Sequence, residues 1–338
     1  MQAENAKKEI ITLDYGSGGE KTSRLIESMI LPAFDNPALR VLGDGAVLKG
    51  GERLVFSADS FVVTPWRFPG GDIGKLCVCG TVNDVCMAGG RPEYLSLSFI
   101  IEEGFPAEDL ETIISSIARE AQKAGVSIVT GDTKVVERGK GDGIYINTAG
   151  IGIQRAEIPG RSAICRGDAV ILSGSAGCHG AAVMMARAGL LGDDVLRSDC
   201  RSLEELSRAV LENGTVRIMR DPTRGGVATT LNEFTEGMPF SIELTEEWIP
   251  VEPAVEAACE LLGLDPLYCA CEGRLLAVVA QEDADAVVEA LRALEGGEGA
   301  ARIGTVTEIH PGKVFLKTRL GGIRFLPKLS GQQLPRIC

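Results

Sequence analysis

Five aspartates stand beside glycine, asparagine or other small residues at widely separated points of the sequence. They are Asp44, Asp59, Asp84, Asp132 and Asp221. Carboxylates from several loops can converge on Mg²⁺, which takes oxygen ligands and commonly accepts one or two protein carboxylates beside nucleotide phosphates. Each aspartate alone could equally be a turn or helix-cap residue, because Asp is favoured in such places.

A denser motif occupies residues 221–226, which read Asp-Pro-Thr-Arg-Gly-Gly and directly precede a helical pattern from Val227. No turn requires an acid, a hydroxyl, a guanidinium and two glycines together. The Arg224 guanidinium and the N–H groups of the helix start would face phosphate, and the Asp221 carboxylate would bind a metal ion. The motif therefore favours a magnesium–nucleotide site.

A glycine-rich segment, Gly16-Ser17-Gly18-Gly19, precedes a helical stretch over residues 21–30. Backbone N–H groups at such a helix start can cradle an anion. It is not a Walker A loop, because that motif ends in Gly-Lys-Ser/Thr. A purely structural turn would need the same glycines, so both interpretations stay open.

The sequence ends in a polar tail, residues 328–338, whose last residue is Cys338. At about 3.3–3.6 Å per residue, an extended tail of this length could reach across a domain. The other nine cysteines are expected to act as small buried hydrophobes, because a chain in a reducing compartment keeps its thiols free. The two Cys-x-Cys pairs lack the spacing of common zinc sites.

Composition limits the classes of protein that this chain can belong to. A length of 338 residues predicts two domains, and a net charge of −13 argues against a nucleic-acid partner, which requires clustered Lys and Arg. Residues 1–8 are polar, and no apolar run approaches the roughly 18 residues of a membrane span, so we expect a cytoplasmic protein.

The apolar pattern of the first half predicts an α/β unit that would position the aspartates. Strands are expected over 54–63, 94–101, 126–130 and 144–151. The clearest helix runs over 106–124, where Leu110, Ile113, Ile114 and Ile117 recur at helical spacing between Pro106 and Gly125. Most of the aspartates would then follow the end of a strand or helix.

The second half repeats the alternation of helices and strands after a polar connection over residues 155–167. Helices are expected over 181–190, 203–212 and 227–234, and strands over 169–173, 275–280 and 314–317. We predict a first domain over residues 1–154, a second over 155–327, and a mobile tail over 328–338.

The motifs together resemble a known superfamily. Four segments carry the resemblance, namely residues 43–46 (Gly-Asp-Gly-Ala), 82–92 (Val-Asn-Asp-Val to Gly-Gly-Arg-Pro), 131–134 (Gly-Asp-Thr-Lys) and 221–226. Their order and spacing resemble the ATP-binding superfamily of aminoimidazole ribonucleotide synthetase and selenophosphate synthetase. The terminal Pro335-Arg336-Ile337-Cys338 resembles the end of the hydrogenase-maturation carbamoyl dehydratases, the HypE family.

This resemblance implies a two-domain α/β (α+β) fold of the PurM-like type, with a ferredoxin-like N-terminal domain and a C-terminal α/β domain. It also implies ATP-dependent dehydration of a carbamoyl group on Cys338 to a thiocyanate, which provides the cyanide ligand for the iron of [NiFe]-hydrogenase. Because oxygen leaves an amide poorly, ATP would first phosphorylate the carbonyl oxygen.

The resemblance also implies roles for individual residues. Cys338 would carry the substrate group, Glu272 would be the base, and Lys134 would polarise the carbamoyl oxygen. The magnesium ligands would be Asp44, Asp84 and Asp221. The ATP-binding residues would be Gly16, Ser17, Gly18, Gly19, Asp59, Asn83, Thr130, Asp132, Thr133, Thr223 and Arg224.

One departure concerns the start of the second domain's first helix, where Cys178 stands in place of an acid that relatives tend to have before His179-Gly180. His179 is expected to be a helix-start residue, since magnesium–phosphate chemistry does not require a histidine there.

The implied partners are a separate carbamoyltransferase that loads Cys338, a scaffold complex that holds iron, and a second copy of the chain in a homodimer. Two alternatives remain. The chain could be a nucleotide-gated carrier of the carbamoyl group without dehydratase activity. It could also resemble selenophosphate synthetase in function, although residues 16–19 lack the reactive cysteine of that family.

Overall fold

The computed structural model describes residues 10–16, 20–41, 48–190, 196–329 and 337. Its main helices are α1 (Glu20–Leu25), α2 (Leu31–Phe34), α3 (Ile73–Met87), α4 (Ala107–Lys123), α5 (Cys178–Arg187), α6 (Glu204–Asn213), α7 (Gly226–Thr235), α8 (Pro253–Leu262) and α9 (Ala284–Arg292). A π-helix, Ile26–Ile30, joins α1 to α2. Within the described residues, none of the helices combines the length and apolar composition that crossing a membrane requires.

A four-stranded sheet forms the first half, in the order β1-β6-β4-β5. Its strands are β1 (Leu54–Phe61), β4 (Gly90–Glu102), β5 (Ser127–Val136) and β6 (Ile144–Gln154). Only β4 and β5 are parallel, and the other pairs are antiparallel. Helix α4 begins and ends within one residue of its predicted bounds, because its apolar stripe packs inward between Pro106 and Gly125.

A seven-stranded sheet forms the second half, in the order β13-β12-β9-β11-β7-β10-β8. Its strands are β7 (Ala169–Leu172), β8 (Val216–Arg220), β9 (Ser241–Thr245), β10 (Leu276–Val279), β11 (Ala301–Thr307), β12 (Val314–Lys317) and β13 (Ile323–Phe325). A short hairpin, β2 (Arg67–Phe68) with β3 (Gly71–Asp72), precedes α3. The predicted domain bounds stay a prediction, and β6 ends at Gln154.

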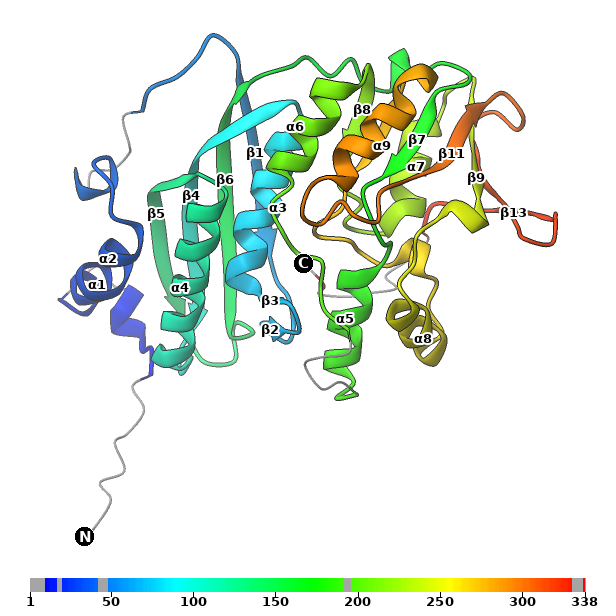
Figure 1. Ribbon diagram of the computed structural model, residues 1–338. Coiled ribbons are helices and arrows are strands. Elements are labelled where there is room, and N and C mark those ends of the chain that lie inside the picture. The colour runs from blue at the N-terminus through cyan, green and yellow to red at the C-terminus, as the bar shows by residue number, and fades with distance from the viewer. Residues whose placement is uncertain (1–9, 17–19, 42–47, 191–195, 330–336, 338) are drawn as a thin grey trace.

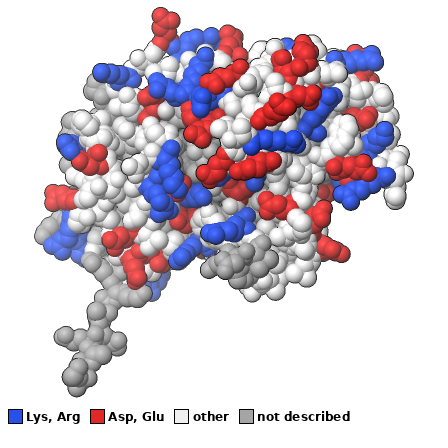
Figure 2. Space-filling model, viewed as in Figure 1, with Lys and Arg blue, Asp and Glu red and all other residues white. Residues whose placement is uncertain are grey.

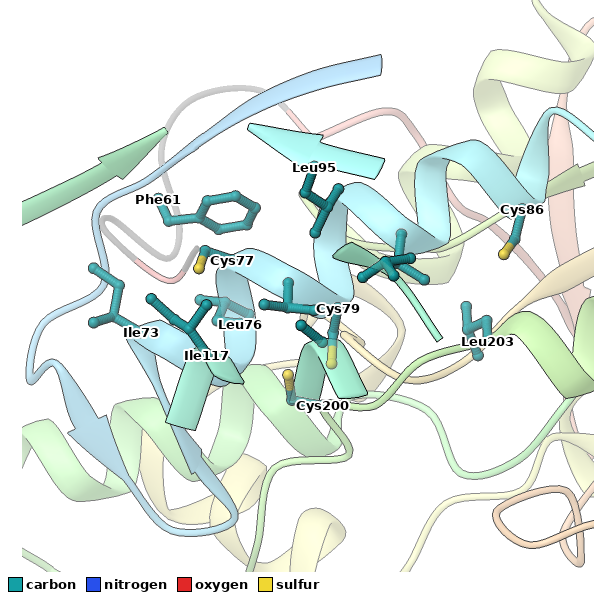
Figure 3. Packing of buried hydrophobic residues seen from close by; sticks show 14 of the residues in the cluster. Phe61, Ile73, Leu76, Cys77, Cys79, Cys86, Leu95, Ile117, Cys200 and Leu203 are labelled. Carbon is teal, nitrogen blue, oxygen red and sulfur yellow. The ribbon is translucent and has the colours of Figure 1, made fainter. Parts of the chain in front are cut away.

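Helix α3 lies between the first sheet and the second half of the chain (Figure 1). Thirteen of its fifteen residues are buried, so the helix is apolar all round. Figure 3 shows Phe61 and Leu95 of the sheet packed against this helix, with Leu203 and Cys200 on its other side. One hydrophobic core therefore runs through both halves and fixes residues of α3 relative to the second sheet.

Charged side chains of both signs are interspersed over the face shown in Figure 2. Arg and Lys often lie beside acids, as in the ion pairs Arg155–Glu204 (2.7 Å) and Arg201–Glu295 (2.9 Å). Such exposed pairs each stabilise the fold by only about 0–1 kcal/mol.

Candidate active site

Three of the predicted acids gather where β1, α3 and the loop after β8 meet. Asp59 points to the α3 side of β1, and Asp84 lies in α3, where Ser57 Oγ donates to Asp84 Oδ2 over 2.7 Å. Asp221 follows β8 directly and is buried. The expectation that most of these acids end an element is wrong for Asp59 and Asp84, which lie inside β1 and α3, because the buried faces of these elements meet here.

Two of these carboxyl groups, those of Asp59 and Asp221, have a raised pKa. Burial is the main cause that raises the pKa of Asp221 to about 7, and the charges of Asp84 and then Asp59 add to it. Burial likewise raises the pKa of Asp59, with a further rise from Asp84 that the nearby Arg224 guanidinium opposes. A divalent cation bound among these carboxylates would neutralise their negative charges and relieve their repulsion.

The predicted phosphate-binding motif forms the loop between β8 and α7. Gly225 and Gly226 both have left-handed backbone angles (φ 75° and 60°), and Gly225 caps α7. A side chain at Gly226 would lie 2.6 Å from the Cys269 carbonyl oxygen, so only glycine fits this approach. The exposed Arg224 stands at the start of α7, as predicted, with Thr223 half-buried beside it.

Glu272 lies on the segment before β10 with only 1% of its surface exposed. Its Oε1 has no hydrogen-bond partner among the described residues. Burial raises the pKa of its carboxyl well above the usual range, and the charges of Asp221, Asp199 and Asp59 raise it further. Glu272 is therefore a buried acid that lies close enough to Asp221 and Asp59 to feel their charges.

Asn83, a predicted nucleotide contact, has its side-chain amide bound to main-chain groups of the second half of the chain. Its side chain is fully buried, its Nδ2 donates to the carbonyl oxygens of Arg201 (3.0 Å) and Glu272 (3.3 Å), and its Oδ1 accepts from Leu203 N (2.8 Å). Its amide thus ties α3 to the main chain at Glu272.

Asp132 and Lys134 are not brought together with the other acids within one chain. Strand β5 extends to Val136, beyond its predicted end at Thr130, so both residues lie inside a strand because β5 keeps pairing with β4. They occupy the face of the sheet opposite α3, where Lys134 Nζ lies 2.9 Å from Asp132 Oδ1. Both side chains are more than half exposed, and this pairing lowers the pKa of Asp132.

The remaining predicted residues divide into two groups. Thr130 and Thr133 lie on β5 and are half-buried, and Gly16 ends a 3₁₀ turn, Leu13–Gly16. Four predicted ATP or metal residues and the substrate-bearing residue lie outside the described residues, namely Ser17, Gly18, Gly19, Asp44 and Cys338.

The described cysteines are free thiols, and eight of the nine are buried. The expectation of nine buried cysteines is wrong for Cys165, which is exposed because it lies in the polar connection before β7. Figure 3 shows the Cys79 and Cys200 sulfurs directed toward one another, and this contact with Cys79 raises the pKa of the Cys200 thiol well above its usual range.

Sequence reasoning missed the contact between His179 and the end of the tail. His179 does lie at a helix start, in the first turn of α5, as expected. Its Nε2, however, lies 2.9 Å from the carbonyl oxygen of Ile337, and both residues are buried. No sequence pattern signals a contact between residues 158 positions apart.

Two domain models describe the class of protein that this fold and site define. Residues 42–154 match the AIR synthase related protein N-terminal domain, and residues 166–317 match the AIR synthase related protein C-terminal domain. The chain therefore belongs to the AIR synthase related proteins. The predicted two-domain PurM-like fold and family are confirmed.

Relatives that match over nearly their whole length place the chain, within this class, in the HypE carbamoyl dehydratase family. The chain is 50% identical over 338 residues to "Carbamoyl dehydratase HypE" of Cupriavidus necator. This match covers 99% of this chain and 96% of the relative. A solved structure of HypE in complex with ATP superposes with a TM-score of 0.93 at 46% identity, covering 97% and 99% of the two chains. HypE from a HypE–HypF complex matches with a TM-score of 0.78 at 43% identity, covering 90% and 99%.

Proposed function

We propose that this protein dehydrates a carbamoyl group carried on the sulfur of its own Cys338, with ATP as the co-substrate. The thiocarbamate R–S–C(=O)NH₂ and ATP would give the thiocyanate R–S–C≡N, ADP and phosphate. The observation that carries this proposal is the buried Glu272 carboxyl, with its free Oε1, beside three clustered aspartates in a HypE-family fold. The product would supply the cyanide ligand for a hydrogenase iron.

The residues present fit Mg²⁺ with a nucleotide. Asp84 and Asp221 would hold the metal, since their mutual repulsion is relieved by a cation and both offer the oxygen ligands that magnesium takes. Asp59 lies beside them, and Arg224 with the start of α7 would face phosphate. When bound, the metal and nucleotide supply charge neutralisation and the phosphoryl group that turns the amide oxygen into a leaving group.

Glu272 would serve as the base for the amide protons. Burial and the neighbouring acids raise its pKa, which brings the carboxyl closer to the pH at which a base is effective. The main chain around it is held by Asn83, which accepts from Leu203 and donates to the Glu272 carbonyl. The protein thus positions the acceptor of the protons rigidly.

The exposed face of the first sheet supports the proposal of a homodimer. Leu54, Phe56 and Ile100 project from this face with 55%, 68% and 44% of their surfaces exposed. Asp132 and Lys134 lie on the same face. An apolar patch of this kind marks an interface, and a second copy placed on it would bring these two residues to the dimer interface, where Lys134 could act on the carbamoyl oxygen.

The partner that loads Cys338 would be a separate carbamoyltransferase, and a scaffold that holds iron would receive the product. A relative solved as a HypE–HypF complex supports the formation of a protein complex on this fold. ATP is supported as the nucleotide by the relative solved in complex with ATP.

Intact mass of the carbamoylated protein, before and after Mg-ATP, tests the proposal. We expect loss of the mass of one water, only with ATP, and no carbamoylation of a C338A variant. If the carbamoyl mass stays although ATP binds, the protein is a nucleotide-gated carrier. If no carbamoyl is accepted, the tail does not carry the substrate.

A further inference from the structure

The described end of the tail is docked in a buried site between the two halves of the chain. Ile337 is 4% exposed and belongs to the core cluster shared by both halves. Its carbonyl oxygen lies 2.9 Å from His179 Nε2. The ring of Phe68, from β2 in the first half, packs nearly perpendicular to the His179 ring, with 5.2 Å between centroids. Both halves therefore form the wall behind this histidine.

The hydrogen bonds fix the tautomer of His179. A carbonyl oxygen can only accept, so Nε2 carries the proton and donates to Ile337. In the neutral ring Nδ1 is then an acceptor, and Ser198 Oγ, 2.8 Å away, donates to it. Ser198 Oγ in turn accepts from Cys200 N over 3.1 Å. Burial lowers the pKa of His179, which favours the neutral ring.

The residue next to Ser198 connects this chain of hydrogen bonds to Glu272. Asp199 Oδ1 accepts from Glu272 N over 3.2 Å. The charge of Asp199 also acts on both His179 and Glu272. Two adjacent residues, Ser198 and Asp199, thus bind the histidine that contacts Ile337 and the main chain of the acid proposed as the base.

We propose that His179, oriented by Ser198, is a positioning residue that latches the main chain at Ile337 in this buried position. By holding the Ile337 carbonyl it fixes the peptide bond that leads to Cys338, and thereby sets where the carbamoyl group is presented. This inference deepens the proposed dehydration and rests on it for its catalytic consequence, whereas the latch itself rests on the contact with Ile337. One buried hydrogen bond and the burial of Ile337 then stabilise this position of the chain end.

Limited trypsin digestion tests the latch without any need for activity. Cleavage after Arg336 removes Ile337 and Cys338, and intact mass identifies that product. Loss of one buried hydrogen bond predicts that H179A is cleaved there about tenfold faster than the wild type. In H179Q the amide nitrogen replaces Nε2 as the donor, so its rate should stay within about twofold of the wild type.

A matched variant separates the latch from general loosening of the core. Val183 is also buried on α5, and V183A should destabilise the fold without faster cleavage after Arg336. Equal rates for wild type and H179A, or equal acceleration in V183A, would overturn the latch.

Single-turnover dehydration of the carbamoylated protein tests the catalytic consequence. We expect H179A to lower the rate at saturating Mg-ATP about tenfold, H179Q to restore it, and the half-saturating ATP concentration to stay the same. An H179A rate equal to that of the wild type would overturn the positioning role. If the wild type shows no dehydration, the proposed function fails, while the digestion still decides the latch.

Discussion

Asp199 and Glu272 are joined through the backbone, because the Glu272 N–H donates to Asp199 Oδ1 over 3.2 Å. Only 1% of the Asp199 side chain is exposed, and its Oδ2 lies 3.5 Å from Arg274 Nε. Asp199 therefore has two tasks in one buried place. It holds the main chain of the proposed base, and it balances the charge of the largely buried Arg274.

Replacing Asp199 should separate these tasks. D199N keeps an oxygen that can accept from Glu272 N but leaves the Arg274 guanidinium without its countercharge, so we expect a loss of about 3 kcal/mol of unfolding free energy. Urea unfolding measures this. D265N, which breaks the more exposed pair of Asp265 with Arg324, should cost less than about 1 kcal/mol. Equal effects of the two variants would show that Asp199 is not a buried countercharge.

Glu272 should make the stability of the ligand-free protein fall as the pH rises. Below its unfolded pKa both states are protonated, and above it the unfolded chain loses the proton while the folded protein keeps it. We expect E272Q to be more stable than the wild type at pH 8, with a smaller difference at pH 5. Melting temperatures across this range measure the effect. The exposed carboxylate of Glu260 on α8 gives the control, E260Q, and a pH-independent difference for E272Q would refute the burial argument.

The elements that the sequence predicted well are those with one apolar and one polar side. Helix α4 shows helical spacing between Pro106 and Gly125, and its observed bounds, Ala107–Lys123, follow that pattern. Helix α3 is buried on nearly all sides, so its apolar residues have no helical period from which its bounds could be predicted. Strand β5 was ended too early, because polar residues alternate on its exposed face.

The candidate site was only partly predictable for a related reason. Motifs identified Asp84, Asp221 and Arg224 because unusual residues cluster in short segments. The orientation of a residue depends on which face of an element it occupies, and Asp132 lies on the face of the sheet opposite Asp59. The partner of His179 depends on the path of the whole chain, which local spacing does not record.

Binding of magnesium with ATP should weaken as the pH falls through about 7. The pKa of Asp221 is raised to about 7, and a protonated carboxyl must release its proton before it binds a metal. We expect the Kd measured by calorimetry to rise about tenfold from pH 8 to pH 6. D221N should bind more weakly and lose this part of the pH dependence, whereas titration of the nucleotide phosphate affects both proteins alike. The exposed carboxylate of Asp285 on α9 offers a control, D285N. An unchanged slope in D221N would exclude Asp221 as a ligand.

Charge on the exposed face of the first sheet should break the proposed dimer. Phe56 is 68% exposed in β1, beside Leu54 and on the same face as Lys134. An aspartate there would place a desolvated charge in an apolar interface, so F56D should sediment as a monomer where the wild type sediments as a dimer. L320D changes the fully exposed Leu320, after β12, and should leave the dimer intact.

If Lys134 acts from this interface, F56D also loses dehydration, and mixing F56D with an inactive C338A chain does not restore it. A wild type that sediments as a monomer, or a dimeric F56D, would remove the basis for placing Lys134 at a shared site.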